Sequence, residues 1–432
     1  MNQKNLKILD CTFRDGGYYN NWNFEDSLIV EYLNACSKAK IDIVEIGFRF
    51  KNKKKGYGPL AFTDEKYLQK INFPKNMLIS VMINANEFID DDDSEMIKSI
   101  KDSFIPKKKS IISIVRVAIN FNTYDKGKTI VKTLSQLGYK VGFNLMQSQN
   151  KKVNEIYDVI NSIKKWKCID YLYFADSIGV MDPKYVDLFI KALKNKWKNS
   201  PIGIHAHNNK SLAFINSMQA LMSGASMIDC TILGMGRGAG NTPTETLLLE
   251  LENNNYHYRP SHLVDILPKF TRLLSKYKWG PNYFYHFAAI NNIHPTYIQK
   301  LLTDTRYSDD QIKLALTNLS QNKSNFFIED NLKLALYNKK SYIDNYDAKN
   351  FFNKKTICIV GSGSSGIKQK EKIVQFIKKN KPIVLSLNIN PYIDEKLIDY
   401  YVSCYEYRVF FDAPQYQKIN KPIIMPYSIF KN

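Results

Sequence analysis

Eight short apolar runs, rich in β-branched residues, recur through the first 240 residues of the chain and are separated by amphipathic segments. The runs cover 6–12, 41–48, 77–84, 110–120, 140–147, 170–177, 202–208 and 227–234. The segments 25–40 and 154–166 between them have helical periodicity. Strand followed by helix, with nearly continuous apolar strands, indicates buried parallel strands joined by crossover helices. Eight such units favour an α/β fold of the closed (β/α)8 TIM-barrel type, with an open doubly wound sheet as the alternative.

The remainder of the chain divides into two further parts. After a barrel domain at 1–245, the region 246–350 is mainly helical in pattern and turns polar from about residue 304, as a helical cap and linker would. Strand patterns resume at residue 356 and recur at 382–390 and 407–413. We therefore predict a small Rossmann-like α/β module at 351–432.

Charge and cysteine usage narrow the classes of partner and compartment. The 61 basic residues exceed the 41 acidic ones, giving a net charge of +20, but only eight are Arg and the lysines are spread along the chain. A nucleic-acid interface would favour an Arg-rich stripe, so no nucleic-acid partner is expected. No run approaches the roughly 20 apolar residues of a membrane span. Six scattered cysteines without a CxxC pair and an N-terminus without an apolar signal predict a cytoplasmic protein.

Polar side chains gather where the predicted strands end. In a barrel of this type the active groups come from the C-terminal ends of the strands. Four of the eight arginines fall at this predicted face, which a random scatter of surface charges would not produce. The residues at these ends, in chain order, are Arg14, Asp15, Glu45, Arg49, Arg116, Asp176, Ser177, His205, His207, Arg237 and Asn241.

His205-Ala206-His207 is the strongest local signal. Residues i and i+2 of a strand project to the same face, so both imidazoles can converge on one ion. With Asp15 expected at the same rim, two histidines and a carboxylate predict a divalent metal site that acts as a Lewis acid. Two hydrogen-bonded histidines of the barrel core are the alternative interpretation.

Four motifs in order resemble the DRE-TIM metallolyases over about residues 6–300. They are Arg14-Asp15-Gly16, Ala175-Asp176-Ser177-Ile178-Gly179, His205-Ala206-His207-Asn208 and the glycine-rich loop from Gly234 to Asn241. That family includes 3-hydroxy-3-methylglutaryl-CoA lyase, isopropylmalate and homocitrate synthases, and 4-hydroxy-2-oxovalerate aldolase.

The resemblance implies a set of residue roles. Asp15, His205 and His207 would hold a divalent metal, completed by Asn241. Mn²⁺ or Mg²⁺ is the expected ion, with Zn²⁺ and Co²⁺ as alternatives. Arg14 would stabilise an enolate, and Ser177 would contact a keto acid. The predicted substrate-binding set is Arg14, Asp15, Glu45, Arg116, Ser177 and His205.

The resemblance also implies a reaction. The loop from Gly234 to Asn241 lacks the cysteine of the CoA lyase, and Ala175-Asp176-Ser177 favours the aldolase branch. The expected reaction cleaves or forms a C–C bond of a 4-hydroxy-2-keto acid through a pyruvate-type enolate, with a 2-keto acid and an aldehyde as small-molecule partners. The expected assembly is a homo-oligomer. A Claisen-type synthase joining a 2-keto acid and an acyl-CoA is one alternative. A repurposed barrel with a nucleotide-sugar-binding module and no lyase activity is the other.

One catalytic position departs from the aldolase pattern. The aldolase has a proton-transferring histidine soon after its Arg-Asp-Gly, where this chain has Gly17, Tyr18 and Tyr19. Either a tyrosine takes that role, with Tyr18 as our candidate, or the base comes from elsewhere, or the reaction differs. Gly16 and Gly17 are expected to let the loop bend over the barrel mouth. Tyr283 is the nearest match to a tyrosine that the aldolase uses from the region after the barrel.

The C-terminal module carries a glycine-rich loop directly after its first strand. Gly361, Gly363 and Gly366 fit GxGxxG, a loop whose backbone N–H groups suit a phosphate. The second strand ends in Leu387-Asn388 rather than in the acidic residue that would hold a ribose hydroxyl. The sequence predicts a nucleotide or phosphorylated sugar here, with a structural turn as the alternative.

Overall fold

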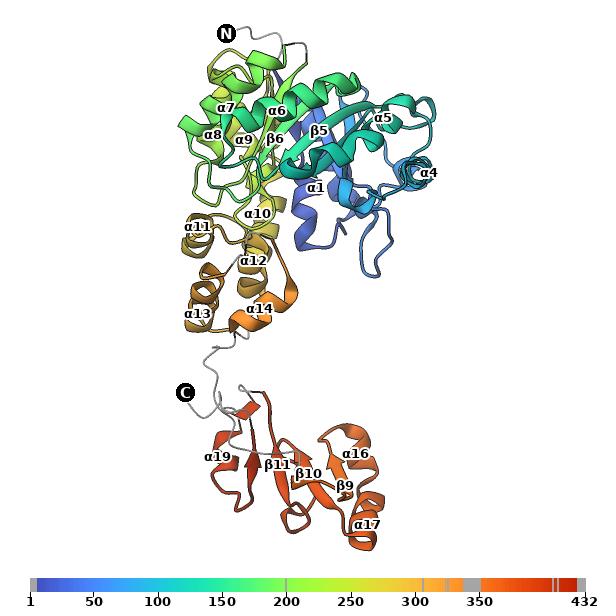
Figure 1. The fold of residues 1–432 in the computed structure, drawn as a ribbon, viewed down its shortest axis with the longest axis vertical. Coiled ribbons are helices and arrows are strands. Elements are labelled where there is room, and N and C mark those ends of the chain that lie inside the picture. The colour runs from blue at the N-terminus through green and yellow to red at the C-terminus, as the bar shows by residue number, and fades with distance from the viewer. Residues whose placement is uncertain are drawn as a thin grey trace. The chain divides into compact units, whose positions relative to one another are not determined.

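The computed structural model describes residues 6–198, 200–304, 307–322, 324, 326–336, 351–405, 408–409 and 412–425 (Figure 1). The chain forms two compact units. The first is Met1–Asp304 with Leu319–Ile328, and the second is Thr305–Asn318 with Glu329–Asn432. The division into 1–245, 246–350 and 351–432 stays a prediction, and 337–350 lie outside the described residues.

The first unit contains a closed barrel of eight parallel strands in sequential order, which confirms the predicted fold. The ring closes where β1 pairs with β8, with Lys7 opposite Met227 and Asp10 opposite Cys230. Each predicted apolar run contains one strand. The strands are β1 (Lys7–Asp10), β2 (Ile43–Phe48), β3 (Leu78–Asn84), β4 (Ile114–Asn120), β5 (Lys140–Met146), β6 (Tyr171–Asp176), β7 (Ile202–Ala206) and β8 (Met227–Cys230).

Amphipathic helices surround the barrel and bury their apolar faces against the strands (Figure 1). In α7, for example, Val186, Phe189, Ile190 and Leu193 are buried at helical spacing, and the Phe189 ring stacks on Phe174 of β6 at 4.5 Å. The helices after successive strands are α1 (Thr12–Gly16), α2 (Asp26–Lys38), α3 (Glu65–Leu68), α4 (Asp93–Ser103), α5 (Lys128–Gln136), α6 (Val153–Ile163), α7 (Pro183–Lys196), α8 (Ala213–Met222) and α9 (Thr244–Asn253).

The barrel interior is filled by its own side chains. A separate buried cluster from the strands includes Leu9, Ile43, Ile114, Tyr173 and Met227. Packing of this kind makes the barrel a solid core rather than a pore, so a ligand site lies at the mouth.

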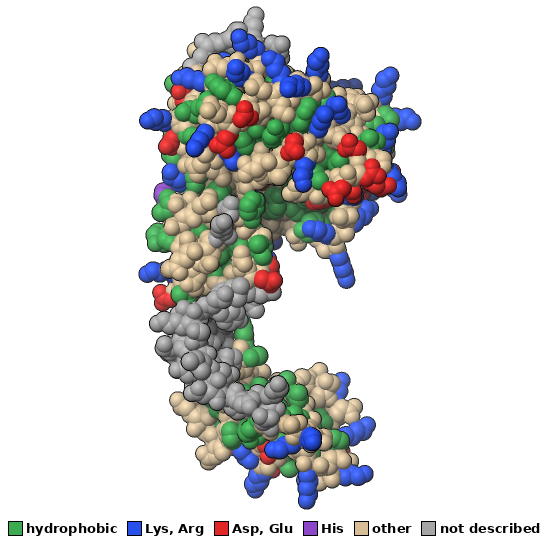
Figure 2. All heavy atoms as spheres, in the orientation of Figure 1, with side chains coloured by type: hydrophobic (Ala, Val, Ile, Leu, Met, Phe, Trp, Pro, Cys, Tyr) green, Lys and Arg blue, Asp and Glu red, His purple; other side chains and the backbone are tan. Residues whose placement is uncertain are grey.

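Helices follow the barrel, as the apolar spacing of 246–336 predicts. Their bounds are α10 (Leu267–Tyr277), α11 (Tyr283–Ile290), α12 (Pro295–Thr303), α13 (Asp309–Ser320) and α14 (Glu329–Leu336). Within the described residues, no helix is both long and apolar enough to cross a bilayer. Figure 2 shows Lys and Arg side chains dispersed among acidic and hydrophobic ones on the visible face rather than in one stripe.

The second unit contains a four-stranded parallel sheet in the order β12-β11-β10-β9, which confirms a small α/β module. Its core includes Val360, Val384, Ile398 and Tyr401. The elements are β9 (Ile357–Val360), α16 (Ser364–Lys368), α17 (Lys370–Asn380), β10 (Ile383–Leu387), β11 (Tyr400–Val402), α19 (Ala413–Tyr416) and β12 (Ile423–Ile424).

The strand predicted at 407–413 is wrong. The third strand is β11, which has only three residues and was too short to be recognised by an alternating pattern. Arg408 and Val409 are helical instead, and Arg408 Nε donates a hydrogen bond to Asp412 Oδ2 at 2.6 Å, one helical turn later. Residues 407, 410 and 411 lie outside the described residues.

Candidate active site and metal centre

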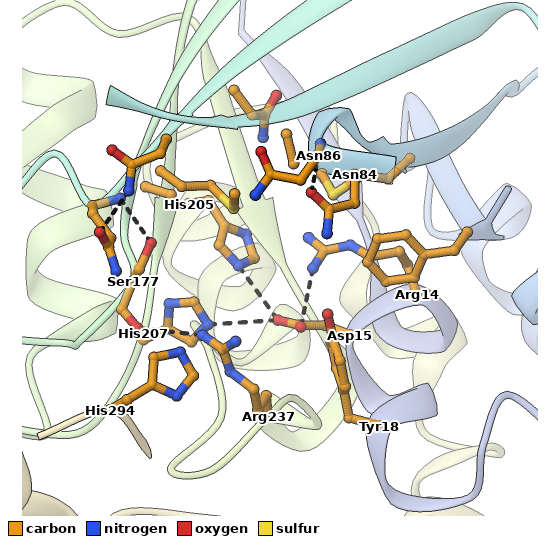
Figure 3. Close-up of a pocket in the computed structure, with 18 of the residues that line it drawn as sticks. Arg14, Asp15, Tyr18, Asn84, Asn86, Ser177, His205, His207, Arg237 and His294 are labelled. Atoms are coloured by element: carbon orange, nitrogen blue, oxygen red, sulfur yellow. Dashed lines mark hydrogen bonds and ion pairs between the residues drawn. The ribbon is translucent and has the colours of Figure 1, made fainter. Parts of the chain in front are cut away.

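A cavity of about 530 Å³ opens at the C-terminal ends of the barrel strands. Its wall combines residues from the ends of β2 to β7, the turn after β1, the loop after β8 and the chain before α12 (Figure 3). Arg14, Asp15, Ser177, His205 and His207 all line it, so the structure brings these predicted site residues together.

The turn after β1 is one turn of helix, α1, rather than an extended strand end. Asp10 organises its start, because its Oδ1 accepts a hydrogen bond from the Thr12 backbone N–H at 2.9 Å. Gly16 and Gly17 have ordinary helical φ values of −68° and −59°. The expected role in bending the loop is therefore wrong. These glycines are required for space, since a Cβ at Gly17 would lie 2.0 Å from the Trp22 ring.

Asp15 and the two histidines converge on one point. Asp15 Oδ2 lies 3.3 Å from His205 Nε2 and 3.9 Å from His207 Nε2. The ligand atoms of all three residues fall within 4.8 Å of one another, and all three side chains are buried. The two imidazole rings stand almost perpendicular, with centroids 4.9 Å apart. Two histidines and a carboxylate in this arrangement could hold a metal ion.

The outer nitrogen of each imidazole is already engaged. His205 Nδ1 lies 2.9 Å from the Asp229 carboxylate, and His207 Nδ1 lies 2.9 Å from the backbone carbonyl of Asp176. Both partners accept hydrogen bonds, which assigns the proton to Nδ1 and leaves Nε2 facing the site as a ligand. Such outer partners orient metal-binding histidines and raise their basicity.

Asn241 lies beside this cluster. It follows the loop after β8 and pairs through its backbone with His207. Its Nδ2 lies 3.1 Å from His205 Nε2. Within the described residues, Asn241 Oδ1 and Asp15 Oδ2 are buried without a hydrogen-bond partner. Buried oxygens left unpaired are costly unless a cation is bound, so these residues fit a divalent metal.

The backbone of Gly236 lies close to both of these oxygens. A Cβ there would lie 1.7 Å from Asn241 Oδ1 and 3.2 Å from Asp15 Oδ2. We therefore expect Gly236→Ala to displace Asn241 and to weaken Mn²⁺ binding by about tenfold or more, measured by titration calorimetry. Gly363→Ala is the control, since a Cβ at Gly363 meets nothing within 4 Å. Unchanged Mn²⁺ affinity in Gly236→Ala would contradict this assignment of the ligand set.

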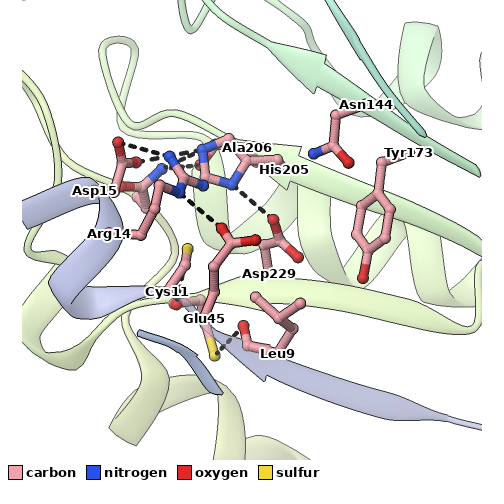
Figure 4. A network of polar contacts seen from close by, with 12 residues as sticks. Leu9, Cys11, Arg14, Asp15, Glu45, Asn144, Tyr173, His205, Ala206 and Asp229 are labelled. Carbon is pink, nitrogen blue, oxygen red and sulfur yellow. Dashed lines mark hydrogen bonds and ion pairs between the residues drawn. The ribbon is translucent and has the colours of Figure 1, made fainter. Parts of the chain in front are cut away.

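A buried ion-pair network supports the centre from below (Figure 4). Glu45 Oε1 accepts hydrogen bonds from Arg14 Nε at 2.8 Å and from Arg116 Nη1 at 3.2 Å. Arg116 Nη2 donates to Asp229 at 2.6 Å, and Asp229 in turn holds His205. Glu45 and Arg116 are fully buried and do not line the cavity, so the structure does not bring these two predicted substrate-binding residues to its wall.

Asp229 is a site residue that the sequence analysis missed. It lies in the middle of β8, flanked by Met227, Ile228 and Cys230. A carboxylate inside an otherwise apolar strand was the signal available, because a buried charge requires a partner. That partner is Arg116, 113 residues earlier in the chain.

The electrostatics prepare Asp15 and His207 for a cation, whereas burial of His205 is outweighed by hydrogen bonds to Asp15 and Asp229, which raise the pKa of His205. Burial alone would raise the pKa of the Asp15 carboxyl, but Arg14 and the two imidazoles hold this pKa well below its ordinary value. Burial and the neighbouring His205 lower the pKa of His207 to about 3. At neutral pH Asp15 is therefore an anion and His207 a neutral imidazole, the protonation states that metal binding requires.

Ser177 and Tyr18 also line the cavity. Ser177 Oγ accepts a hydrogen bond from the Gln147 backbone N–H at 2.9 Å, so its own proton can be donated to a ligand. The Tyr18 ring packs edge-on against Trp22 and lies under the Arg237 guanidinium, while 37% of the residue stays exposed. Both residues are therefore available to a bound molecule.

Tyr283 is not brought to this cavity. It begins α11, is 67% exposed, and lines a separate surface pocket with Pro281 and His286. The aromatic residue next to it, Phe284, meets its ring edge-on. Because the two pockets have no lining residue in common, the structure offers no support for Tyr283 as a catalytic group.

The glycine-rich loop of the C-terminal module connects β9 to α16. Gly361 and Gly363 border open space, whereas a Cβ at Gly366 would clash with the Tyr392 hydroxyl. That hydroxyl donates a hydrogen bond to the Gly361 carbonyl, which holds the loop closed on itself. The helix that follows has only five residues. Phosphate binding at this loop stays a prediction.

Arg237, which the sequence placed after the last strand, lines the cavity from the loop after β8 (Figure 3). Several other cavity residues were not selected from the sequence. His294, at the N-cap of α12, is one of them (Figure 3). Amide side chains from the ends of β3, β4 and β5 form another part of the wall, namely Asn84, Asn86, Asn120, Asn122, Asn144 and Gln147. The sequence signal for the first four of these amides was the repeated pattern Ile-Asn-x-Asn at 83–86 and 119–122.

Comparisons with known proteins agree with this geometry. The family model described as HMGL-like matches residues 95–270. A 4-hydroxy-2-oxovalerate aldolase from Carboxydothermus hydrogenoformans is 30% identical over 257 residues, which cover 59% of this chain and 72% of the relative. An oxaloacetate decarboxylase from Mycobacterium tuberculosis is 24% identical over 251 residues, covering 58% of this chain and 70% of the relative.

Solved structures show the same barrel. The N-terminal domain of a candidate aldolase from Bacteroides vulgatus is 33% identical, with a TM-score of 0.61 over 70% of this chain and 98% of that domain. The carboxyl transferase domain of Rhizobium etli pyruvate carboxylase, solved with pyruvate, has a TM-score of 0.60 at 13% identity, over 78% of this chain and 61% of that one. The second likeness concerns the fold alone.

Proposed function

The chain belongs to the HMGL-like family of carbon–carbon lyases, and from this premise we propose that it is a metal-dependent aldolase acting on a 4-hydroxy-2-keto acid. In the cleavage direction the C4 hydroxyl loses its proton and the C3–C4 bond breaks. An aldehyde leaves, and the bonding electron pair forms a pyruvate enolate. Protonation of that enolate at C3 gives pyruvate. The observation that carries the proposal is the convergence of Asp15, His205 and His207 at the barrel mouth beside Arg14.

Asp15, His205 and His207 would hold the divalent cation, with Asn241 Oδ1 beside them. When bound, the ion supplies Lewis acidity at the carbonyl and carboxylate oxygens of the keto acid. Oxygen and imidazole donors suit Mn²⁺ and Mg²⁺, and we propose one of these ions.

Arg14 is the group we assign to enolate stabilisation. Its Nε is held by Glu45 and its Nη1 by Asp15, at 2.8 and 3.0 Å. Within the described residues, Arg14 Nη2 is buried and has no hydrogen-bond partner. A guanidinium fixed on two sides with one free N–H₂ is a preorganised donor for a developing oxyanion.

Ser177 and Arg237 are suited to bind the carboxylate of the keto acid. The Ser177 hydroxyl can donate, as its oxygen already accepts from Gln147. Arg237 Nη2 donates to the Ser177 carbonyl at 3.4 Å, which keeps the two side by side. Within the described residues, Arg237 Nε is buried without a partner. Charge-assisted hydrogen bonds of this kind fix an anion in one orientation.

Two ionisable groups that line the cavity, Tyr18 and His294, have not yet been given a role and could act on the C4 oxygen of the substrate. His294 Nδ1 accepts a hydrogen bond from the Thr296 N–H, which leaves the proton on Nε2. Burial, Arg237 and His207 lower the pKa of His294 to about 2, so the ring is a neutral hydrogen-bond donor. We assign proton transfer to the Tyr18 hydroxyl and polarisation of the aldehyde oxygen to His294 Nε2–H, a neutral-imidazole role known from other enzymes.

Exchange of the pyruvate methyl protons tests the proposal, because it reverses the final step and needs no aldehyde. Protein loaded with Mn²⁺ in ²H₂O is expected to exchange these protons, followed by NMR. Asp15→Asn is expected to lose Mn²⁺ binding and exchange together. Asp265→Asn, at an exposed aspartate, is the control. Absence of exchange in the wild type would refute the proposal, and consumption of acyl-CoA with a 2-keto acid would favour the Claisen-type alternative.

A further inference from the structure

The cavity is larger than pyruvate and a short aldehyde require. Its volume of about 530 Å³ lies in the range of pockets that enclose drug-sized ligands. Asp15 lies near the middle of the view, with His205 and His207 on one side of it and Arg14 from α1 on the other (Figure 3). Asn84 and Asn86 lie on the opposite side of this cluster from Arg237 and His294 (Figure 3). The region on the side of Asn84 and Asn86 is available to the second substrate.

This region is built by a motif that occurs twice. Ile83-Asn84-Ala85-Asn86 ends β3 and Ile119-Asn120-Phe121-Asn122 ends the neighbouring β4. In each motif the first Asn caps the turn that follows. Asn84 Oδ1 accepts the Asn86 N–H at 3.3 Å, and Asn120 Oδ1 accepts the Asn122 N–H at 2.9 Å. The turns therefore hold the side-chain oxygens of Asn84 and Asn120 in place.

Three amides of the wall keep hydrogen-bonding capacity for a ligand, whereas the Asn120 side chain is already engaged, because its Nδ2 donates to Gln147 Oε1 at 2.6 Å. Asn144 Oδ1 accepts from Arg116 Nε at 3.2 Å, and Asn84 Oδ1 is used by its own turn. Within the described residues, the side-chain nitrogens of Asn84 and Asn144 have no hydrogen-bond acceptor, and the exposed Asn86 side chain has no partner. The wall thus presents fixed N–H donors together with amide oxygens.

The side chains of the same wall are neutral and partly apolar, although Lys151 Nζ, which does not line the cavity, donates a hydrogen bond to Asn122 Oδ1 at 2.6 Å. Among the described residues that line the cavity, none from the ends of β3, β4 and β5 is Lys, Arg, Asp or Glu. Phe48 and Phe50 stack at 4.6 Å on the adjacent side, next to Met82. Amides bind hydroxyl groups as donor and acceptor, and an aromatic face accommodates C–H groups. A phosphate would instead call for Arg or Lys.

We propose that the aldehyde partner is a neutral, polyhydroxylated aldehyde of the sugar type, whose hydroxyl groups bind the amide wall. This inference rests on the proposed aldolase function and deepens it. The wall is defined as Asn84, Asn86, Asn120, Asn122 and Asn144. The product of condensation with pyruvate is accordingly a polyhydroxylated 2-keto acid, and a reaction that supplies free sugar aldehydes must precede this step.

Condensation of pyruvate with matched four-carbon aldehydes tests the inference. The panel is D-erythrose, butanal and erythrose 4-phosphate, with the full-length protein, Mn²⁺ and saturating pyruvate. We expect kcat/KM for D-erythrose to exceed that for butanal by about tenfold or more, because a site built to bind hydroxyls leaves its amides unpaired with butanal. Erythrose 4-phosphate is expected not to exceed D-erythrose.

Two variants test whether the preference for D-erythrose over butanal arises at the amide wall. Asn86→Ala and Asn122→Ala remove exposed amides and retain the backbone N–H groups of the turns. In each, the loss of kcat/KM for D-erythrose is expected to exceed the loss for butanal by about threefold to tenfold. Asn161→Ala, on the exposed side of α6, is the control.

The possible outcomes distinguish a failure of the sugar-aldehyde assignment from a failure of the proposed aldolase function. Equal or faster turnover of butanal, faster turnover of the phosphorylated aldehyde, or equal losses for both aldehydes in the variants would each overturn the sugar-aldehyde assignment. If pyruvate methyl exchange persists in those cases, the aldolase function stands without it. If the wild type shows no methyl exchange, both proposals fail.

Discussion

Arg14→Lys is expected to lower the rate of pyruvate methyl exchange by about 10²- to 10³-fold, the usual cost of removing one preorganised donor to an oxyanion. Lysine retains the positive charge but cannot reach Glu45, Asp15 and the ligand in the fixed geometry of a guanidinium. The loss should therefore appear in the rate constant at saturating pyruvate. Mn²⁺ affinity should change far less, because Arg14 is not a ligand.

Arg49→Lys is the matched control for this experiment. Arg49 is also buried, and it donates hydrogen bonds to Glu65 and to backbone carbonyls, but it does not line the cavity. Both variants lose a buried guanidinium, so a general effect on folding would reduce activity in both. Equal loss of exchange in Arg14→Lys and Arg49→Lys would contradict the assignment of Arg14 to the enolate.

Arg116→Leu is expected to lower the free energy of unfolding by about 3–5 kcal/mol, since removing one partner of a buried ion pair leaves the others uncompensated. Arg116 is fully buried, and its Nη groups lie 3.2 Å from Glu45 and 2.6 Å from Asp229. The Tyr173 ring lies under the Arg116 guanidinium at 4.1 Å and belongs to the buried core of the barrel. The site is therefore closed to water that would otherwise solvate the carboxylates that lose Arg116.

Urea unfolding, followed by circular dichroism, measures this effect. Arg272→Leu is the control, because Arg272 lies exposed on α10. The double variant Arg116→Leu/Asp229→Leu is expected to recover part of the lost free energy, because it also removes Asp229, the carboxylate left without its arginine, while Glu45 keeps its contact with Arg14. A change of less than about 1 kcal/mol in Arg116→Leu would contradict the role of this network.

The convergence of Asp15, His205 and His207 was predictable from sequence because each of its signals is local. His205 and His207 lie two residues apart, and alternation along a strand places such residues on one face. Asp15 follows the first apolar run by a few residues, so barrel closure alone brings it to the same mouth. Each of the eight strands also lies inside its predicted run, because buried parallel strands are continuous apolar segments.

The supporting residues were not predictable in the same way. Arg116 and Asp229 pair across 113 residues, and no local pattern states which buried charges will meet. The same holds for His294, which reaches the cavity from the start of α12, and for Tyr283, which does not reach it although the sequence match favoured it. The register between strands and the packing of later helices decide these contacts.

The sequence by itself determined the (β/α)8 barrel, the strand ends that carry chemistry, and the two-histidine, one-carboxylate set, because period-2 alternation and apolar runs are properties of consecutive residues. Only the tertiary structure decided that Glu45 and Arg116 lie away from the cavity wall, and that two Asn-x-Asn turns stand side by side on that wall at the ends of β3 and β4. Those facts depend on how distant strands are aligned when the barrel closes, which no single segment encodes.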